Sequence, residues 1–299
     1  MFDPNNPNLA EDPFKTYQQK LDIINKENNL TNNAFIKLNI DQSILGNKDT
    51  VIYHYTTIET ARDYILKEGT FRYGEITNLN DEQDFDVNIV SFNTNKQNYL
   101  NYMASFYPEI NFKGIIKAAT TYDLYPKRII QDMYDKFIER IDNYGVLCFT
   151  RNYDTRLLWT HYGDKGKGIC LGFKIKAVYG SIVSPVKYSP NMLRANYYNP
   201  DFDAFIFWVY QKDIQFEYED EIRFFCRDVK AVCDQNRCIT FDKTLLPVIY
   251  FGAKTSPGDI QSIKDVSKNK KYPKNIELYQ LQKNFMNYGY LTPIKIPFY

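Results

Sequence analysis

Apolar and polar positions at the start of the main part of the chain predict a strand, a helix and a second strand. VIYHY at 51–55 has the composition of a short strand, and FRYGEI at 71–76 alternates as a strand does. The intervening IETARDYILKE predicts a helix, with Thr56 and Glu59 as its capping box. Gly69 is placed to end that helix, since glycine is frequent just after a helix.

The same patterns divide the rest of the chain. Apolar residues recur every three to four positions after residue 129 and predict an amphipathic helix. Residues 91–127 are aromatic and predict no regular element. Strands are predicted at 144–150, 168–175, 181–188 and 246–252. Further helices are predicted at 155–162 with Asp154 as cap, at about 201–212, and after Ser256 with Pro257 in the first position.

The chain is predicted to hold one α+β domain over 49–299, preceded by a helical extension over 1–48. Phe14, Tyr17 and Leu21 recur at helical spacing in this extension. No internal repeat and no Gly/Ser linker divides the remainder, which favours a single domain.

Composition and charge narrow the class of protein. Lys plus Arg number 37 and Asp plus Glu number 36, so no overall field attracts nucleic acid or a membrane surface. The polar, acidic N-terminus does not resemble a signal peptide, and no apolar run reaches the roughly 20 residues of a membrane span. Five cysteines without a CxxC pair are typical of a reducing compartment. We expect a cytoplasmic protein.

His54 is the first candidate for chemistry. It stands at the end of a predicted strand, just before a predicted helix, where it could hydrogen-bond a ligand near the sheet edge. Strand alternation places Ile52 and His54 on one face and Tyr53 and Tyr55 on the other. The alternative is a structural histidine that bonds a nearby carbonyl group.

Glu219, Glu221 and Arg223 form the second candidate. On a strand these three side chains share one face, with the two carboxylates about 6–7 Å apart beside a guanidinium. Such a group can stabilise a developing charge. The alternative is a solvated strand face with an ion pair that contributes less than about 1 kcal/mol.

The stretch WTHYGDKGKG, at 159–168, is the third candidate. Trp159 and Tyr162 lie three residues apart on a predicted helix, so their rings can meet. The two lysines among glycines could contact a phosphate, but the spacing is not that of a P-loop. The alternative is a glycine turn that leads into the next strand.

Two further stretches predict little chemistry. The acidic residues of NLNDEQDFD, at 78–86, lack the spacing and the glycine of a calcium loop, so no metal is expected. Cys148 lies within an apolar strand, where it is a poor nucleophile.

Four blocks resemble the bacterial family called domain of unknown function 2971 over about 50–265. They are VIYHYTT with the following NLND, the central CFTRN…LLWTHYGDKGKGICLGF, FEYEDEIRFF and VIYFGAKTS. The third block departs from the family at Phe216, where tryptophan is usual.

The order of these blocks also resembles, more distantly, the ADP-ribosyltransferases. The resemblance implies a pair of small packed sheets with surrounding helices and NAD as co-substrate in a cleft between the sheets. It implies that Glu221 is catalytic and that Glu219 orients the acceptor. It also implies binding roles for His54, Tyr55, Tyr73, Thr150, Trp159, Tyr162 and Arg223, with Tyr73 or the pair Trp159 and Tyr162 stacking on nicotinamide.

The resemblance therefore implies an enzyme that transfers ADP-ribose from NAD to an unidentified protein or nucleic acid, as a toxin or phage-defence effector, with an antitoxin or regulatory protein as a further partner. A carboxylate would stabilise the positive charge that forms on the ribose as nicotinamide leaves. The alternative is a non-catalytic nucleotide-binding or protein-interaction module that uses the same cleft. A metal-dependent nuclease is disfavoured, because no cluster of metal ligands is present in the sequence. The enzyme hypothesis expects His54, Glu221 and an aromatic ring to converge in one pocket; placement on opposite sides of the core would argue against it.

Overall fold

The computed structural model describes residues 50–298 except 80, 82–83, 108, 175–181, 192–194, 199–207, 234–235 and 285–290. The predicted extension over 1–48 and most of the helix predicted at about 201–212 lie outside these residues. The described chain divides into two compact units, one within Asn80–Asp142 and Asn191–Gln211 and the other within Ser43–Leu79, Asn143–Pro190 and Lys212–Tyr299. The single domain over 49–299 stays a prediction. No described helix has both the length and the apolarity needed to cross a membrane.

The first unit is a small helical assembly with an aromatic interior. Helix α5 packs on α6, and α6 on α7. Phe92 stacks on Tyr197 at 4.9 Å, and Phe137 meets Trp208 at 5.0 Å. The stretch 91–127, for which the sequence predicted no regular element, thus contains two helices. The elements are η4 (Val87–Ile89), β4 (Val90–Ser91), α5 (Lys96–Phe106), α6 (Phe112–Leu124), α7 (Pro126–Ile141) and β9 (Ala195–Asn196).

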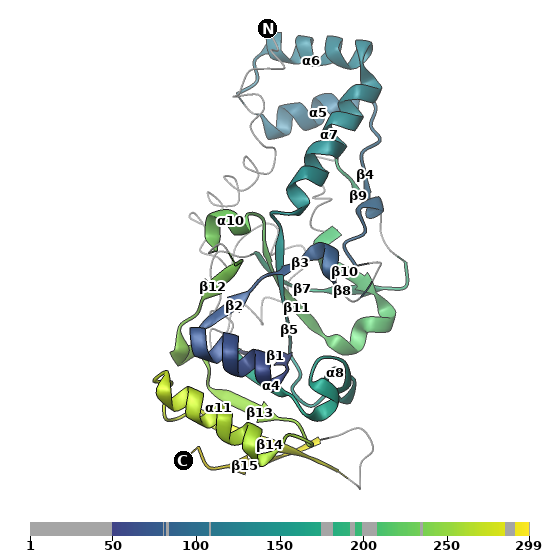
Figure 1. Ribbon diagram of the computed structural model, residues 1–299. Coiled ribbons are helices and arrows are strands. Elements are labelled where there is room, and N and C mark those ends of the chain that lie inside the picture. Colours follow the sequence, from purple (N-terminus) through teal and green to yellow (C-terminus); the bar gives the residue numbers. More distant parts are fainter. Residues whose placement is uncertain are drawn as a thin grey trace. The chain divides into compact units, whose positions relative to one another are not determined.

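The second unit is built on a mixed sheet, in which the described strands number nine. Their order is β15-β14-β13-β6-β1-β5-β11-β7, with β3 also paired to β5 (Figure 1). The strands are β1 (Val51–Thr56), β3 (Gly74–Glu75), β5 (Gly145–Thr150), β6 (Ile169–Lys174), β7 (Ile182–Pro185), β11 (Glu221–Cys226), β13 (Val248–Phe251), β14 (Glu277–Lys283) and β15 (Leu291–Ile296).

Shorter elements complete this unit. β2 (Thr70–Arg72) pairs with β12 (Cys238–Thr240), and β8 (Lys187–Ser189) pairs with β10 (Gln211–Asp213). The helices are α4 (Ile58–Thr60), η2 (Ala61–Leu66), η3 (Ile76–Asn78), α8 (Arg156–His161), η5 (Asp164–Gly166), η7 (Ile214–Glu219), α10 (Val229–Val232), η8 (Lys243–Leu245) and α11 (Pro257–Asn269). The described residues thus combine helices with one large mixed sheet and small two-stranded sheets, in keeping with the predicted α+β class. The pair of small packed sheets that the ADP-ribosyltransferase resemblance implied is not confirmed.

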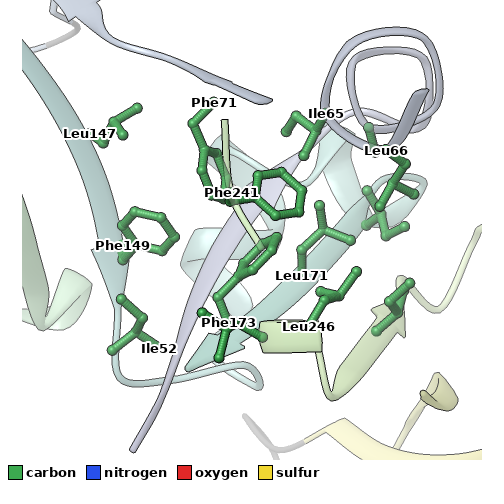
Figure 2. Close-up of a cluster of buried hydrophobic side chains, with 14 of the residues drawn as sticks. Ile52, Ile65, Leu66, Phe71, Leu147, Phe149, Leu171, Phe173, Phe241 and Leu246 are labelled. Carbon is green, nitrogen blue, oxygen red and sulfur yellow. The ribbon is translucent and has the colours of Figure 1, made fainter. Parts of the chain in front are cut away.

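One face of the large sheet is covered by the main hydrophobic core. Phe149 of β5 and Phe173 of β6 meet Phe71 here, and Ile65 and Leu66 of η2 lie over them (Figure 2). Ile263 of α11 belongs to the same cluster. Burial of these side chains supplies the main drive for folding, at about 1.5–3 kcal/mol for each large residue.

The boundaries of the helices that flank the sheet follow local chemistry. The first helix begins after Thr57, whose side chain accepts a hydrogen bond from the Thr60 amide, and not after Thr56 as predicted. Gly69 ends it with a φ of 69°, a conformation that glycine adopts without strain. Ser256 caps α11 and Pro257 takes the first position, as predicted. Thr155, and not Asp154, precedes α8.

The strands β1 and β5 share a short junction. Their register contains one pair, Tyr53↔Thr150. By contrast, β1 aligns six residues with β6, and β5 aligns six with β11. We call this contact the β1–β5 junction. It divides the sheet into a half with β6, β13, β14 and β15 and a half with β3, β7 and β11.

Candidate functional site

Three neighbouring strands place Tyr53, Thr150 and Glu221 side by side on one face of the sheet. Tyr53 aligns with Thr150, and Thr150 aligns with Glu221. Residues that oppose one another in a ladder point to the same side. This face is the one opposite the main hydrophobic core, because Phe149 and Ile222, the next residues along β5 and β11, belong to that core.

Glu221 is held by two basic side chains. Arg223 Nε donates to Glu221 Oε1 at 2.7 Å and its Nη2 donates to Oε2 at 3.0 Å, a bidentate pair. Lys212 Nζ lies 3.7 Å from Oε2. The side chains of all three residues are buried, that of Arg223 completely. A buried carboxylate is tolerated here because its charge is matched and hydrogen-bonded.

These contacts set the protonation state of Glu221. Burial by itself would raise the pKa of the carboxyl group, but the charge and hydrogen bonds of Arg223, with Lys212 and Cys148, outweigh burial. The pKa of Glu221 is therefore lowered from its usual 4.5, and the group is an anion at neutral pH.

Glu219 reaches the same lysine from a different element. It is the last residue of the 3₁₀ helix η7, and the strand begins only at Glu221. The condition for a shared strand face, a strand that includes both Glu219 and Glu221, is therefore not met. Lys212 Nζ donates to Glu219 Oε2 at 2.7 Å. Tyr162 Oη donates to Oε1 at 2.8 Å. The two acidic and two basic side chains form one buried group, which we call the carboxylate cluster: Lys212, Glu219, Glu221 and Arg223.

Tyrosines border the carboxylate cluster. The Glu221 amide donates to Tyr188 Oη at 2.9 Å, and Tyr188 is half-buried. Burial, followed by the charge of Glu221, raises the pKa of Tyr188, so it keeps its proton. Tyr218, next to Glu219, is also half-buried. Both tyrosines are therefore partly exposed to solvent beside the buried cluster.

The predicted aromatic stretch forms the adjoining wall. Trp159 of α8 packs edge-on against Tyr55 with 5.0 Å between ring centroids, and its Nε1 donates to the Tyr153 carbonyl at 2.8 Å. Trp159 is buried, while Tyr162 extends from the end of α8 to Glu219. The stretch therefore contacts the carboxylate cluster through Tyr162.

The glycine turn that follows is tightly packed. A Cβ atom on Gly252 would lie 2.2 Å from the Gly166 carbonyl oxygen and 3.1 Å from the Trp159 ring. Lys254 N donates to Gly166 O at 2.8 Å, and Thr255 Oγ1 donates to Gly168 O at 2.9 Å. The turn and Gly252 thus pack closely against the Trp159 ring.

His54 does not join this group. Its ring packs against Phe71 and Phe149 of the main core, with centroids 5.8 and 5.4 Å away. His54 Nδ1 lies 3.0 Å from the Cys148 carbonyl oxygen, across the β1–β5 junction. Burial lowers the pKa of His54, and the carbonyl group offsets this only in part. A neutral ring that donates from Nδ1 matches the structural alternative of the sequence analysis.

Tyr73 also lies apart from the carboxylates. It is fully buried in the main core. Of the residues proposed from the sequence, the structure brings together Glu219, Glu221, Arg223, Thr150, Tyr162, Trp159 and Tyr55 on one side of the sheet, and it leaves His54 and Tyr73 on the other.

Three members of the site were missed from the sequence. Lys212 is buried although lysine is usually exposed, and nothing in YQKDIQF indicates this. Tyr188 stands at the edge of a predicted strand among 26 tyrosines, without a distinguishing pattern. Cys148 is half-buried and its side chain forms a hydrogen bond with Glu221, whereas the sequence predicted a deeply buried thiol.

The cluster offers a matched set of binding groups. Carboxylate oxygens accept hydrogen bonds from hydroxyl groups, and an ionised carboxylate has about four acceptor positions, of which Arg223 takes two on Glu221. Lysine and arginine bind phosphate. The two negative and two positive side chains of the cluster already balance one another. A ligand that carries both hydrogen-bond donors and acceptors therefore fits the cluster better than a lone cation.

Comparisons with known proteins give one result. No curated protein and no solved structure matches the chain. The first of the four blocks that resemble the family, VIYHYTT with the following NLND, and the CFTRN that begins the second block lie outside the part that a family model matches. Residues 158–286, which contain Trp159, Tyr162, Lys212, Glu219 and Glu221, match the family model described as "Protein of unknown function (DUF2971)", and this match supports placing that part of the chain in the family.

Proposed function

We propose that the protein is a nucleotide-binding module whose ligand is taken at the carboxylate cluster. The observation that supports this most is the meeting of Glu219, Glu221, Lys212 and Arg223 in one buried group beside half-buried tyrosines. A nucleotide presents hydroxyl groups to carboxylates, phosphates to cations and a flat base to aromatic rings.

The position of His54 favours binding over the catalytic hypothesis. The ADP-ribosyltransferase resemblance assigned the ribose contact to His54, which faces the main core together with Phe71. In addition, Arg223 occupies one acceptor position on each oxygen of Glu221. The expectation that His54 and Glu221 converge in one pocket is therefore wrong, and a mechanism that needs both is not proposed.

Binding is tested by calorimetry on the full chain with NAD, ADP-ribose and AMP. We expect the unaltered protein to bind. Affinity should fall in Tyr162→Phe, which removes the hydroxyl group that donates a hydrogen bond to Glu219. Tyr64→Phe is the matched control, because Tyr64 is 64% exposed on η2. Absence of binding for all three compounds, or an equal loss in both variants, would overturn the proposal.

A second candidate, an ADP-ribosyltransferase that does not use His54, is supported by the row Tyr53, Thr150, Glu221 and by the lowered pKa of Glu221. In that reaction the bond from the ribose to nicotinamide breaks and its electron pair leaves with nicotinamide. The acceptor atom bonds to the ribose carbon and loses a proton. An anionic Glu221 would stabilise the positive charge on the ribose, an effect of about 3–4 kcal/mol.

For this second candidate, NAD is a co-substrate and no metal is required. The acceptor would be a protein or nucleic acid, in keeping with a toxin or defence effector of the bacterial cytoplasm that a regulatory protein restrains. Chromatography of NAD incubated with the protein distinguishes the candidates. Release of nicotinamide that Glu219→Gln slows and Glu221→Gln abolishes, with near-ultraviolet circular dichroism unchanged, supports the enzyme. Binding with NAD left intact across protein and nucleic-acid acceptors supports the module.

A further inference from the structure

Asp220 lies between Glu219 and Glu221 in the sequence and has an unusual backbone conformation. Its φ is 43° and its ψ is 51°, the left-handed region, where residues other than glycine are uncommon. Asp220 N donates to Glu217 O at 3.1 Å and so ends η7. The chain turns here from the 3₁₀ helix into β11. Glu219 and Glu221 consequently approach Lys212 from two elements, at 2.7 and 3.7 Å.

The side chain of Asp220 is fastened to the end of β5. Its Oδ1 accepts hydrogen bonds from the Arg151 guanidinium, from Nε at 2.8 Å and from Nη2. Its Oδ2 accepts one from Asn152 Nδ2 at 3.2 Å. Arg151 N also donates to Asp220 O at 3.3 Å. Arg151 and Asn152 directly follow Thr150, the partner of Glu221 in the ladder.

We propose that Asp220 is a positioning residue, whose left-handed backbone and fastened carboxylate bring Glu219 and Glu221 together on Lys212. This inference rests on the proposed function of the carboxylate cluster as a binding site. The ion pair with Arg151 is partly exposed, so by itself it contributes little to stability. The left-handed conformation costs roughly 1–2 kcal/mol for residues other than glycine. The role of the ion pair is therefore to hold the Asp220 backbone in this conformation.

Three substitutions separate the backbone from the side chain. Asp220→Asn keeps a residue that tolerates the left-handed region and can still accept from Asn152, Asp220→Gly keeps the conformation without the fastening, and Asp220→Ala removes both. Asp242→Ala is the matched control: Asp242 caps the 3₁₀ helix η8 with its side chain but has an ordinary φ of −75°.

The measurement has two parts on the full chain. Calorimetry with NAD should show affinity within about threefold of the original for Asn, an intermediate loss for Gly, and a loss of about tenfold or more for Ala. Carbon-13 NMR of the Glu221 carboxyl group should show an apparent pKa that stays below 4.5 in Asp220→Asn and rises in Asp220→Ala. The Asp242→Ala control should lower the melting temperature and leave both readings unchanged.

The two parts keep this inference distinct from the proposed function. If the unaltered protein binds no nucleotide but Asp220→Ala raises the Glu221 pKa, the binding proposal is wrong and the positioning role is retained. If Asp220→Ala does not fold, the NMR titrations of the other two variants decide. A higher Glu221 pKa in Asp220→Gly than in Asp220→Asn supports the positioning role, and equal values contradict it. A titration of Glu221 that is the same in all three variants as in the original would overturn the positioning role.

Discussion

The His54 imidazole and the Glu221 carboxylate lie on opposite faces of one sheet, although each belongs to a strand that borders β5. His54 meets Phe149, and Glu221 aligns with Thr150, the next residue of β5. Because adjacent residues of a strand point to opposite sides, one position along β5 separates the two environments. His54 therefore lies in the apolar layer and Glu221 in the polar layer, so substitutions at the two residues should have different effects.

The acid stability of the protein should depend on His54. Its pKa is lowered from 6.5 in the folded state, so the unfolded chain binds the proton first as pH falls. The stability from neutral His54 is present above pH 6.5 and is lost below it, at up to about 1.4 kcal/mol per pH unit. Urea unfolding between pH 7.5 and pH 5, a range on both sides of the usual histidine pKa of about 6.5, measures this slope.

His54→Asn is the informative variant, because its amide can still donate to the Cys148 carbonyl but does not titrate. We expect a smaller slope in this variant. Glu221 does not confound the range: its pKa is lowered from 4.5, so its contribution is lost only as pH falls below that value. An identical slope in His54→Asn would contradict the assignment.

Glu221 and Arg223 should be strongly coupled. Glu221→Gln leaves the fully buried guanidinium without its ionic partner on β11, which by analogy with other buried pairs costs about 3–5 kcal/mol. Replacing both residues by methionine should cost clearly less than the sum of the single changes Glu221→Met and Arg223→Met, since no unmatched charge is left between them. A double-mutant cycle by urea unfolding checks this. Additive effects would show that the pair does not act as a unit.

Tyr162→Phe should lower the free energy of unfolding by about 1.5–3 kcal/mol, the usual range for a hydrogen bond to a charged group. Thermal unfolding of the variant measures it. Thr160→Ala, which removes a side-chain bond to the Arg156 carbonyl on the same helix, is a control for local helix effects. A loss in Tyr162→Phe no greater than that in the control would mean that the Tyr162–Glu219 bond is dispensable.

Gly252→Ala should destabilise the wall that carries Trp159. The added Cβ would lie 2.2 Å from Gly166 O, so backbone must move, at about 1–3 kcal/mol or more. Gly258→Ala is the opposite case, because the nearest atom is 3.8 Å away and the residue lies in the first turn of α11. That change should raise stability by up to about 1 kcal/mol. Melting temperatures that shift in the same direction would contradict the packing around Gly252.

Much of the fold was predictable because local chemistry determines it. The strands at 145–150, 169–174 and 248–251 are apolar runs between turn residues, and Ser256 with Pro257 is a helix start that sequence alone identifies. Residues 96–106 and 112–124 were missed because their aromatic residues pack with one another, and the sequence alone gave no clear helical period.

The site was predictable in its acidic residues and not in their setting. Glu219 and Glu221 stand out by spacing, yet they meet through the left-handed Asp220 and not through a shared strand face. The face of His54 follows from strand alternation, but which face carries the core depends on how the sheet packs. Lys212 had no signal, because burial of a lysine is decided by partners distant in the sequence or across a turn.

The β1–β5 junction has a consequence for how the sheet opens. With one aligned pair, it is joined as much by side chains as by the backbone ladder: His54 reaches the Cys148 carbonyl, and Tyr55 Oη donates to the Asn152 carbonyl at 2.9 Å. The amides on either side of this line should therefore exchange with solvent earlier than those of the β5–β11 ladder. We therefore expect the sheet to open first along the β1–β5 junction, which the carboxylate cluster borders through Thr150 and Glu221.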